Sequence, residues 1–374
     1  MGSMDREYWR NPGERTASRG TWSVTTWLIA LCVGVFVVDA FLPRTWQVVG
    51  TTWVGDPALL DGVRNGTVKY RVVRTDESPS RSASAEQPVV AQTPRGLEPI
   101  VRMQLQSTPP MRKWLSFSTA TAIYTDTPGM GFAGLEVWRF IGFQFCHADL
   151  NHLIFNMIGL FFFGPIVERF LGSRRFLAFY LICGIAGALL YLVLNAAGFA
   201  VMEASGGKPL VPGLLFNDPY TPLVGASAGI FGILIASARI VPNATVLLFF
   251  IVPMRLKTLA YGLVIVAVGT VILGGAKLGS NAGGEAAHLG GAIAGWWLIA
   301  RPDRLQGFFD FFGRAGESVT GRGARRAARV AAERQSRRAV EDAQLDRVLA
   351  KVSEHGLDSL SDEDRRILKD ASRR

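Results

Sequence analysis

Two stretches decide the fold of this 374-residue chain: LNHLIFNMIGLFFFGPIVERFL at residues 150–171 and FLAFYLICGIAGALLYLVLNAAGF at residues 176–199. Each supplies the roughly 20 mostly apolar residues that a helix needs to cross about 30 Å of hydrocarbon. The pattern predicts an all-α membrane protein with a bundle of six transmembrane helices. The other four runs of this kind lie near residues 22–42, 222–241, 256–275 and 283–300.

The overall composition agrees with a membrane protein. The chain is 49% hydrophobic and only 19% charged, whereas about a quarter of the residues in a soluble domain are charged. The net charge is +10, but basic residues beside apolar spans more often set orientation or contact anionic headgroups than bind nucleic acid. We therefore expect the lipid bilayer, and no nucleic acid, as a partner. The three cysteines, Cys32, Cys146 and Cys183, are predicted to be packing residues.

Arginine and lysine in the short connections predict the orientation, because such residues are retained in the cytoplasm. The connections after the second, fourth and sixth spans are basic, whereas the third and fifth carry only Lys208 and Lys277. Both termini are therefore expected in the cytoplasm. The basic residues are Arg169, Arg174, Arg175, Arg239, Arg255, Lys257, Arg301 and Arg304.

The parts outside the bundle differ in composition. The middle of the exterior loop 43–130 is rich in Ser, Pro, Ala and Gln, which predicts a partly disordered insertion. The tail 302–374 is charged and is expected to form soluble cytoplasmic helices with an apolar stripe, the second starting at Ser361; its partner is unknown. The remaining parts are a cytoplasmic N-terminus at 1–21, a first transmembrane helix at 22–42 and a core with five transmembrane helices at 131–301.

Several polar residues fall at the outer ends of the predicted spans. His152 and Asn156 lie one helical turn apart in HADLNHLIFNM (147–157), and Ser227 lies between two glycines in PLVGASAGIFG (222–232). At 1.5 Å per residue, His152, Ser227 and His288 each lie within about 10 Å of the outer boundary. A hydroxyl, an imidazole and further hydrogen-bond donors can thus meet in one layer.

Other readings of these residues are open. A serine between glycines often serves close helix packing, and Asn156 can simply bridge two helices. A zinc site is disfavoured because the sequence has neither HExxH nor a Cys/His cluster. The soluble-hydrolase elbow GxSxG needs a strand before the serine, and here the flanks are predicted transmembrane helix. We expect no metal and no cofactor.

The chain nevertheless resembles a known family. GASAGIFG around Ser227, AHLGGAIAG around His288, HADLNHLIFN and the Glu-x-Trp-Arg string at 136–139 are similar to motifs of the rhomboid intramembrane serine proteases. The resemblance covers roughly residues 130–300 and the first span. It implies a rhomboid-like bundle in a bacterial inner membrane, with a catalytic dyad of Ser227 and His288 and no carboxylate to orient the base. It further implies an oxyanion hole made by Ser227, Asn156 and His152, supporting positions at His147, Phe231 and Gly225, and a membrane-interface loop carrying Trp138 and Arg139.

The activity implied by this resemblance is endoproteolysis of transmembrane segments in other membrane proteins, near the exterior interface. One alternative is a non-catalytic member of the family that binds membrane clients without cutting them. Such members lose the serine or the histidine, and both are present here. A transporter is a third possibility, which the absence of inverted repeats in the sequence disfavours.

Overall fold

The computed structural model describes residues 22–305 with gaps at 74–83, 124, 128–130, 207–210, 249–250 and 275–280. In the tail it also describes the single positions 348, 352, 361 and 364. The chain divides into two units, Met1–Gln306 and Gly307–Arg374. All the helices and strands described below belong to the first unit.

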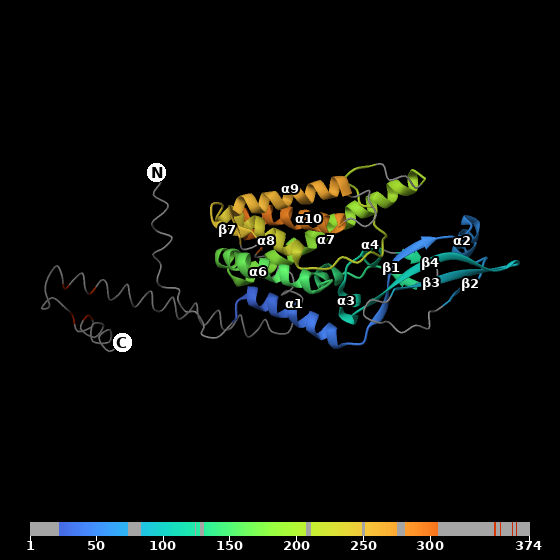
Figure 1. Ribbon diagram of the computed structural model, residues 1–374. Helices are drawn as coiled ribbons and strands as arrows, with labels where there is room; N and C mark the ends of the chain where they lie inside the picture. The colour runs from blue at the N-terminus through green and yellow to red at the C-terminus, as the bar shows by residue number, and fades with distance from the viewer. Residues whose placement is uncertain are drawn as a thin grey trace. The chain divides into compact units, whose positions relative to one another are not determined.

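Six helices occupy the predicted spans and confirm the helical bundle (Figure 1). Apolar side chains on their outer faces remain exposed, such as Phe161 (62%), Ile265 (70%) and Leu273 (75%). Such faces suit hydrocarbon rather than water. Of the six, α1, α6, α7 and α9 are long and apolar enough to cross a membrane. The bounds are α1 (Val24–Phe41), α6 (Leu150–Leu171), α7 (Ser173–Ala204), α8 (Ser227–Ile240), α9 (Leu256–Gly274) and α10 (Ala282–Ile299).

The fourth of these helices is shorter than its apolar run predicts. The run covers 222–241, but α8 has 14 residues and begins at Ser227. The preceding chain is not helical: Leu223 forms a β-bridge with Phe117, and Gly225 has a positive φ of 126°, which favours glycine. Ser227 therefore stands in the first turn of its helix and not in the middle of a span.

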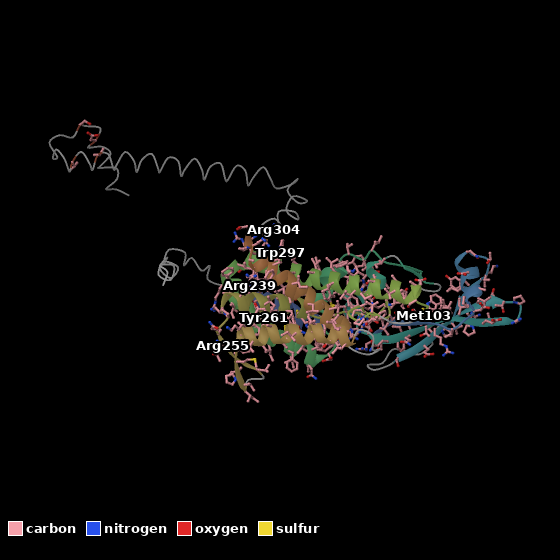
Figure 2. All side chains as sticks on the ribbon, turned by 90° about the horizontal axis from the view of Figure 1, so that it is seen from above. Met103, Arg239, Arg255, Tyr261, Trp297 and Arg304 are labelled. Atoms are coloured by element: carbon pink, nitrogen blue, oxygen red, sulfur yellow. The ribbon has the colours of Figure 1, made fainter. Side chains whose placement is uncertain are left out.

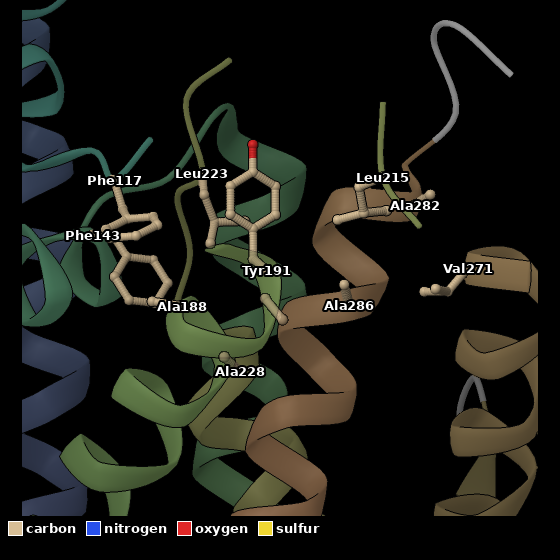
Figure 3. Packing of buried hydrophobic residues seen from close by; sticks show 11 residues of the cluster. Phe117, Phe143, Ala188, Tyr191, Leu215, Leu223, Ala228, Val271, Ala282 and Ala286 are labelled. Atoms are coloured by element: carbon tan, nitrogen blue, oxygen red, sulfur yellow. The ribbon is translucent and has the colours of Figure 1, made fainter. Parts of the chain in front are cut away.

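Helix α10 packs against α7, α8 and α9 at the centre of the bundle. A buried cluster at its N-terminal end joins these helices to the loop segment before α6 (Figure 3). Phe117 and Phe143 come from that loop, Tyr191 from α7, Ala228 from α8 and Ala286 from α10. This packing fixes the start of α8 relative to α10.

Buried carboxylates attach both ends of α1. Glu168 of α6 accepts hydrogen bonds from the Val24 amide (2.8 Å), the Thr25 amide (3.0 Å) and the Thr25 hydroxyl (2.6 Å). At the other end, Asp39 accepts from the amides of Met111 (2.8 Å) and Arg112 (3.0 Å). These amides are unpaired donors in the first turns of α1 and α3, so each carboxylate caps a helix while it joins two elements.

The loop 43–130 contains a folded sheet, so the expected disorder does not extend to residues 84–108. Four antiparallel strands lie in the order β1-β4-β3-β2. Buried Val89, Ala91, Val101 and Met103 form its core together with Val63 of α2. The bounds are β1 (Thr45–Trp53), α2 (Pro57–Arg64), β2 (Tyr70–Val72), β3 (Ser84–Thr93) and β4 (Gly96–Thr108).

The composition of the insertion misled because the apolar side chains are few but regularly spaced. In β4, Val101, Met103 and Leu105 alternate with exposed polar residues, so one face of the strand is apolar. Part of the predicted disordered stretch, residues 74–83, lies outside the described residues.

The sheet is tied to the bundle. Asp218, in the loop before α8, accepts hydrogen bonds from the Thr51 amide (2.7 Å) and hydroxyl (3.2 Å) of β1. Arg44 donates to the Ser107 hydroxyl (2.8 Å) and carbonyl (2.7 Å) at the base of β1 and β4. Shorter elements complete the unit: α3 (Pro110–Leu115), α4 (Thr119–Ala122), β5 (Thr125–Thr127), β6 (Gly131–Ala133), α5 (Arg139–Gly142), the 3-10 turns Phe143–Phe145 and Pro302–Leu305, β7 (Thr245–Leu248) and β8 (Val252–Arg255).

Basic residues gather at the end of the bundle opposite the sheet. Figure 2 places Arg239, Arg255 and Arg304 at one end, and Met103 of the sheet lies beyond the other end. Arg239 donates to the Trp296 carbonyl (2.7 Å) and Arg304 lies 4.6 Å from the ring centre of Trp297. Lys208 and Lys277 lie outside the described residues. The side of the membrane that each end faces stays a prediction.

Most of the tail also lies outside the described residues. At the predicted start of its last helix, the Ser361 amide donates to the Asp364 carboxylate (3.1 Å). The Asp364 amide donates in return to the Ser361 hydroxyl (3.2 Å). This reciprocal pair resembles a capping box, which agrees with a helix beginning at Ser361.

Candidate active site

The Ser227 hydroxyl lies at the N-terminus of α8. The first hydrogen bond of this helix runs from the Ile230 amide to the Ala226 carbonyl (3.0 Å). The amides before Ile230, including that of Ser227, have no acceptor within their own helix, as in any first turn. They lie at the positive end of the helix dipole, where they can stabilise a developing negative charge.

His288 of α10 meets this serine. Its Nε2 lies 2.8 Å from the Ser227 Oγ, which is hydrogen-bond distance. The Phe231 ring, one turn after Ser227 on α8, stacks on the imidazole at 4.2 Å between centroids and 7° between planes. The structure thus brings together the two residues of the predicted dyad and the predicted aromatic neighbour.

A carboxylate lies against the other nitrogen of the imidazole, contrary to the expectation that none orients the base. Glu285 Oε2 is 2.9 Å from His288 Nδ1. Glu285 precedes His288 by three residues, and side chains at this spacing share a helix face. That spacing is the signal in the sequence that could have revealed the contact.

His152 and Asn156 face the same space from α6. The Ala148 amide donates to His152 Nδ1 (3.4 Å), so a neutral His152 carries its proton on Nε2. Gly225 is required here, because a Cβ at this position would lie 2.8 Å from His152 Nε2. The Asn156 amide nitrogen donates to the His152 carbonyl (2.8 Å), which leaves its second N–H available.

His147 lies behind this group. Its ring stands edge-on to His152 at 5.2 Å between centroids, and it is 4% exposed. Burial, reinforced by the neighbouring His152, lowers the pKa of His147 to about 4. His147 is therefore neutral at physiological pH and contacts the site only through His152.

These side chains surround a cavity of about 720 Å³ whose wall is otherwise mainly apolar. The predicted residues that line it are Ser227, His288, His152, Asn156, Gly225 and Phe231. A hydroxyl, an imidazole that can accept its proton and several N–H donors around one cavity form the constellation of acyl-transfer chemistry. Within the described part of the chain, no cluster of three or more His, Cys, Asp or Glu side chains could hold a metal ion.

Comparison with known proteins gives the family. Residues 134–301, which run from before α5 to the end of α10 and contain every residue of the cavity named above, match the Rhomboid domain. This chain contains a Rhomboid domain. It is consequently a multi-pass integral membrane protein. Residues 332–374 match a separate family of unknown function (DUF6576).

The rhomboid relatives come from bacteria and from mitochondria. The chain is 36% identical over 165 residues to RHOMBOID-like protein 12, mitochondrial, of Arabidopsis thaliana (43% of this chain, 46% of the relative). It is 36% identical over 99 residues to Putative rhomboid protease YdcA of Bacillus subtilis (25% and 50%). With Rhomboid protease GluP of the same organism it shares 29% over 165 residues (44% and 26%). The chain thus matches half or less of the length of each relative.

The rhomboid domain begins just before the predicted membrane-interface loop. Trp138 is 46% exposed, and its indole nitrogen donates to the Trp114 carbonyl (3.2 Å). The Arg139 guanidinium is buried instead. It pairs with Glu136 and donates to the carbonyls of Lys113 and Ser116, both at 2.7 Å. Arg139 therefore binds the loop segments to one another, and of the two predicted residues Trp138 is the one with an exposed side chain.

Proposed function

We propose that this rhomboid-family protein is an intramembrane serine endopeptidase with Ser227 as nucleophile and His288 as general base. The observation that carries the proposal is the 2.8 Å contact between Ser227 Oγ and His288 Nε2, made within a cavity that His152 and Asn156 also line. Packing alone would not require an imidazole opposite the serine.

The proposed reaction uses each group in turn. Ser227 Oγ attacks the peptide carbonyl carbon while its proton passes to His288 Nε2, and the carbonyl electron pair moves onto oxygen. In this proposal, the Ser227 amide, the His152 Nε2–H and the free N–H of Asn156 donate hydrogen bonds to that oxygen. Losing one such donor typically costs about 3–4 kcal/mol of transition-state stabilisation. The carbonyl then re-forms and the C–N bond breaks while His288 gives its proton to the leaving amine, which leaves an ester on Ser227 Oγ. Water attacks this ester as its proton passes to His288, and the C–Oγ bond breaks as that proton returns to Ser227 Oγ.

The proposed substrate is a transmembrane segment of another membrane protein, cut near the exterior interface. The peptide bonds of a helix are shielded by its own hydrogen bonds, so the segment must unwind before a carbonyl can reach Ser227. Small or helix-breaking residues near the outer boundary lower the free energy of that unwinding. The position of Ser227 in the first turn of α8 supports cleavage near that boundary.

Cleavage of a reconstituted single-span substrate tests the proposal. Wild-type protein in proteoliposomes is expected to release the exterior part of the substrate, and Ser227→Ala is expected to release none. Ser237→Ala is the matched control: this serine lies on the same helix, with its hydroxyl donating to the Phe163 carbonyl (3.3 Å). Unchanged cleavage by Ser227→Ala would refute the enzymatic role and favour a protein that only binds membrane clients.

We further propose that both termini face the cytoplasm and that the membrane is a bacterial inner membrane. The basic end of the bundle, with Arg239, Arg255 and Arg304 (Figure 2), supports this orientation. A reporter enzyme fused after residue 374 should be active only in its cytoplasmic form; activity of a periplasm-dependent reporter at that position would reverse the orientation.

A further inference from the structure

Three side chains form a continuous row from α8 into the first turn of α10. Ser227 Oγ lies 2.8 Å from His288 Nε2, and His288 Nδ1 lies 2.9 Å from Glu285 Oε2. The carboxylate stands on the far side of the imidazole from the nucleophile. Among the described residues that line the cavity, His288 is present and Glu285 is not, so the glutamate approaches the ring from behind.

Burial and the Phe231 ring restrict the orientation of the His288 imidazole. The His288 and Glu285 side chains are only 15% and 20% exposed, and Phe231 covers one face of the ring. An ionised carboxylate can only accept hydrogen bonds. The contact therefore places the proton of a neutral His288 on Nδ1 and leaves the Nε2 lone pair facing the Ser227 hydroxyl, which is the tautomer that a general base requires.

A purely structural role for Glu285 is the competing explanation. Glu285 lies in the first turn of α10, where a negative charge interacts favourably with the helix dipole. That interaction does not require the carboxylate to turn onto Nδ1, and its loss would change stability and not the protonation of His288. The pH dependence of the reaction therefore separates the two roles.

We propose that Glu285 is a positioning residue for the His288 base, so that the site works as a Ser–His–Glu row and not as a dyad. The proposal rests on the proposed function. When Ser227 Oγ bonds to the carbonyl carbon and its proton moves to Nε2, His288 becomes an imidazolium. Its Nδ1–H still donates to Glu285, which remains ionised and stabilises the new positive charge.

Other polar and ionisable groups also lie near His288, and they are unchanged in every variant described below. His152 of α6 is close enough for its charge to act on His288, and Ser227 reaches it from α8. Other titratable groups on neighbouring elements point elsewhere. On α7, the Tyr191 hydroxyl faces the Thr221 carbonyl and the Tyr180 hydroxyl donates to the Gln144 carbonyl. Asp218 is engaged by Thr51 and Tyr220, and Arg239 of α8 and Tyr261 of α9 lie toward the basic end of the bundle (Figure 2).

The test compares Glu285→Gln with wild type in the full-length protein. Glu285→Gln should lower kcat by about tenfold to a hundredfold, which is part of the roughly hundredfold to ten-thousandfold that a positioned general base contributes, and leave KM nearly unchanged. The acid limb of the pH–rate profile should move to lower pH, because the imidazolium loses its counter-charge. Glu285→Asp keeps the charge on a shorter arm, so it should keep the acid limb near the wild-type position while kcat stays reduced.

Glu203→Gln is the matched control, since it removes an exposed carboxylate at the outer end of α7. It should match wild type in both readouts. The rate constant for Ser227 labelling by a fluorophosphonate, followed against pH, gives the same comparison per active molecule and is independent of the fraction that folds. A Glu285→Gln profile that coincides with that of Glu203→Gln would overturn the proposal.

Failure of this inference is distinct from failure of the proposed function. If wild type cleaves the substrate and Ser227→Ala does not, the proposed enzymatic role is supported, whatever the effect of Glu285→Gln. If wild type and Ser227→Ala behave alike, the enzymatic role itself is wrong, and Glu285 has no base to position.

Discussion

Replacing Gly291 with alanine tests how closely the two helices that carry Ser227 and His288 must approach each other. Gly291 lies three residues after His288 on α10. A Cβ at this position would lie 1.9 Å from the carbonyl oxygen of Ala228, the residue next to Ser227. The clash is with backbone, so no side-chain rotation can relieve it.

The size of the effect follows from that distance. A Cβ essentially never lies closer than 3.0 Å to such an atom, so α10 must shift from α8 by about 1 Å in a tightly packed interior. Overpacking of this kind costs about 1–3 kcal/mol, whereas alanine is favoured over glycine in a helix by only about 1 kcal/mol. The shift would also stretch the Ser227–His288 hydrogen bond of 2.8 Å, and a misplacement of about 1 Å can lower a rate by about a hundredfold.

Two assays measure these effects in detergent-solubilised protein: the melting temperature and the rate of fluorophosphonate labelling. Gly262→Ala on α9 is the matched control, because nothing lies within 4 Å of a Cβ built there. Gly262→Ala should melt at or above the wild-type temperature and react at the wild-type rate. Gly291→Ala should melt lower and react much more slowly.

The reasoning would be refuted if Gly291→Ala were as stable and as reactive as Gly262→Ala. That result would mean that α8 and α10 do not approach closely at this point, and the distance between Ser227 and His288 would then be in doubt.

Three further predictions concern other parts of the molecule. Glu168→Ala removes the acceptor of three donors at the start of α1 and should destabilise the protein by about 2 kcal/mol or more, and an unchanged melting temperature would contradict this. Burial, reinforced by the neighbouring His152, lowers the pKa of His147 to about 4. Neutral His147 therefore contributes stability above the unfolded-state pKa of about 6.5, and this stability is lost as the pH falls toward 4. His147→Gln should flatten the resulting decline in melting temperature, and equal declines in the two proteins would count against this prediction. Asp218→Ala loses both hydrogen bonds from Thr51 and should speed proteolysis of the exterior sheet, whereas wild-type cleavage kinetics would show that the sheet is held by other contacts.

The features that could be predicted from the sequence depend on the lengths of the apolar runs and on the positions of polar residues within them. The bilayer fixes the length of an apolar helix, so the six helices follow from residue counting. The expectation that His152, Ser227 and His288 share one layer agrees with the cavity that all three line. The meeting of Ser227 and His288 required in addition the family resemblance, because spacing along the chain does not say which helix faces turn toward each other.

The features that could not be predicted depend on contacts between distant segments. The late start of α8 arises from the bridge between Leu223 and Phe117, which no local propensity indicates. The sheet of the exterior loop needs four separated strands to share one small core, and its polar composition concealed the alternating pattern of β4. Glu285 had the right spacing from His288, but spacing alone does not show whether a side chain turns onto its neighbour or toward the helix dipole.

The measurement that tests the central claim most directly is mass spectrometry of the full-length protein after reaction with a fluorophosphonate. The account predicts one adduct, located on Ser227, which disappears in Ser227→Ala and in His288→Ala but persists in Ser237→Ala. An adduct on another residue, or equal labelling of the His288→Ala protein, would contradict the claim that these two side chains act together.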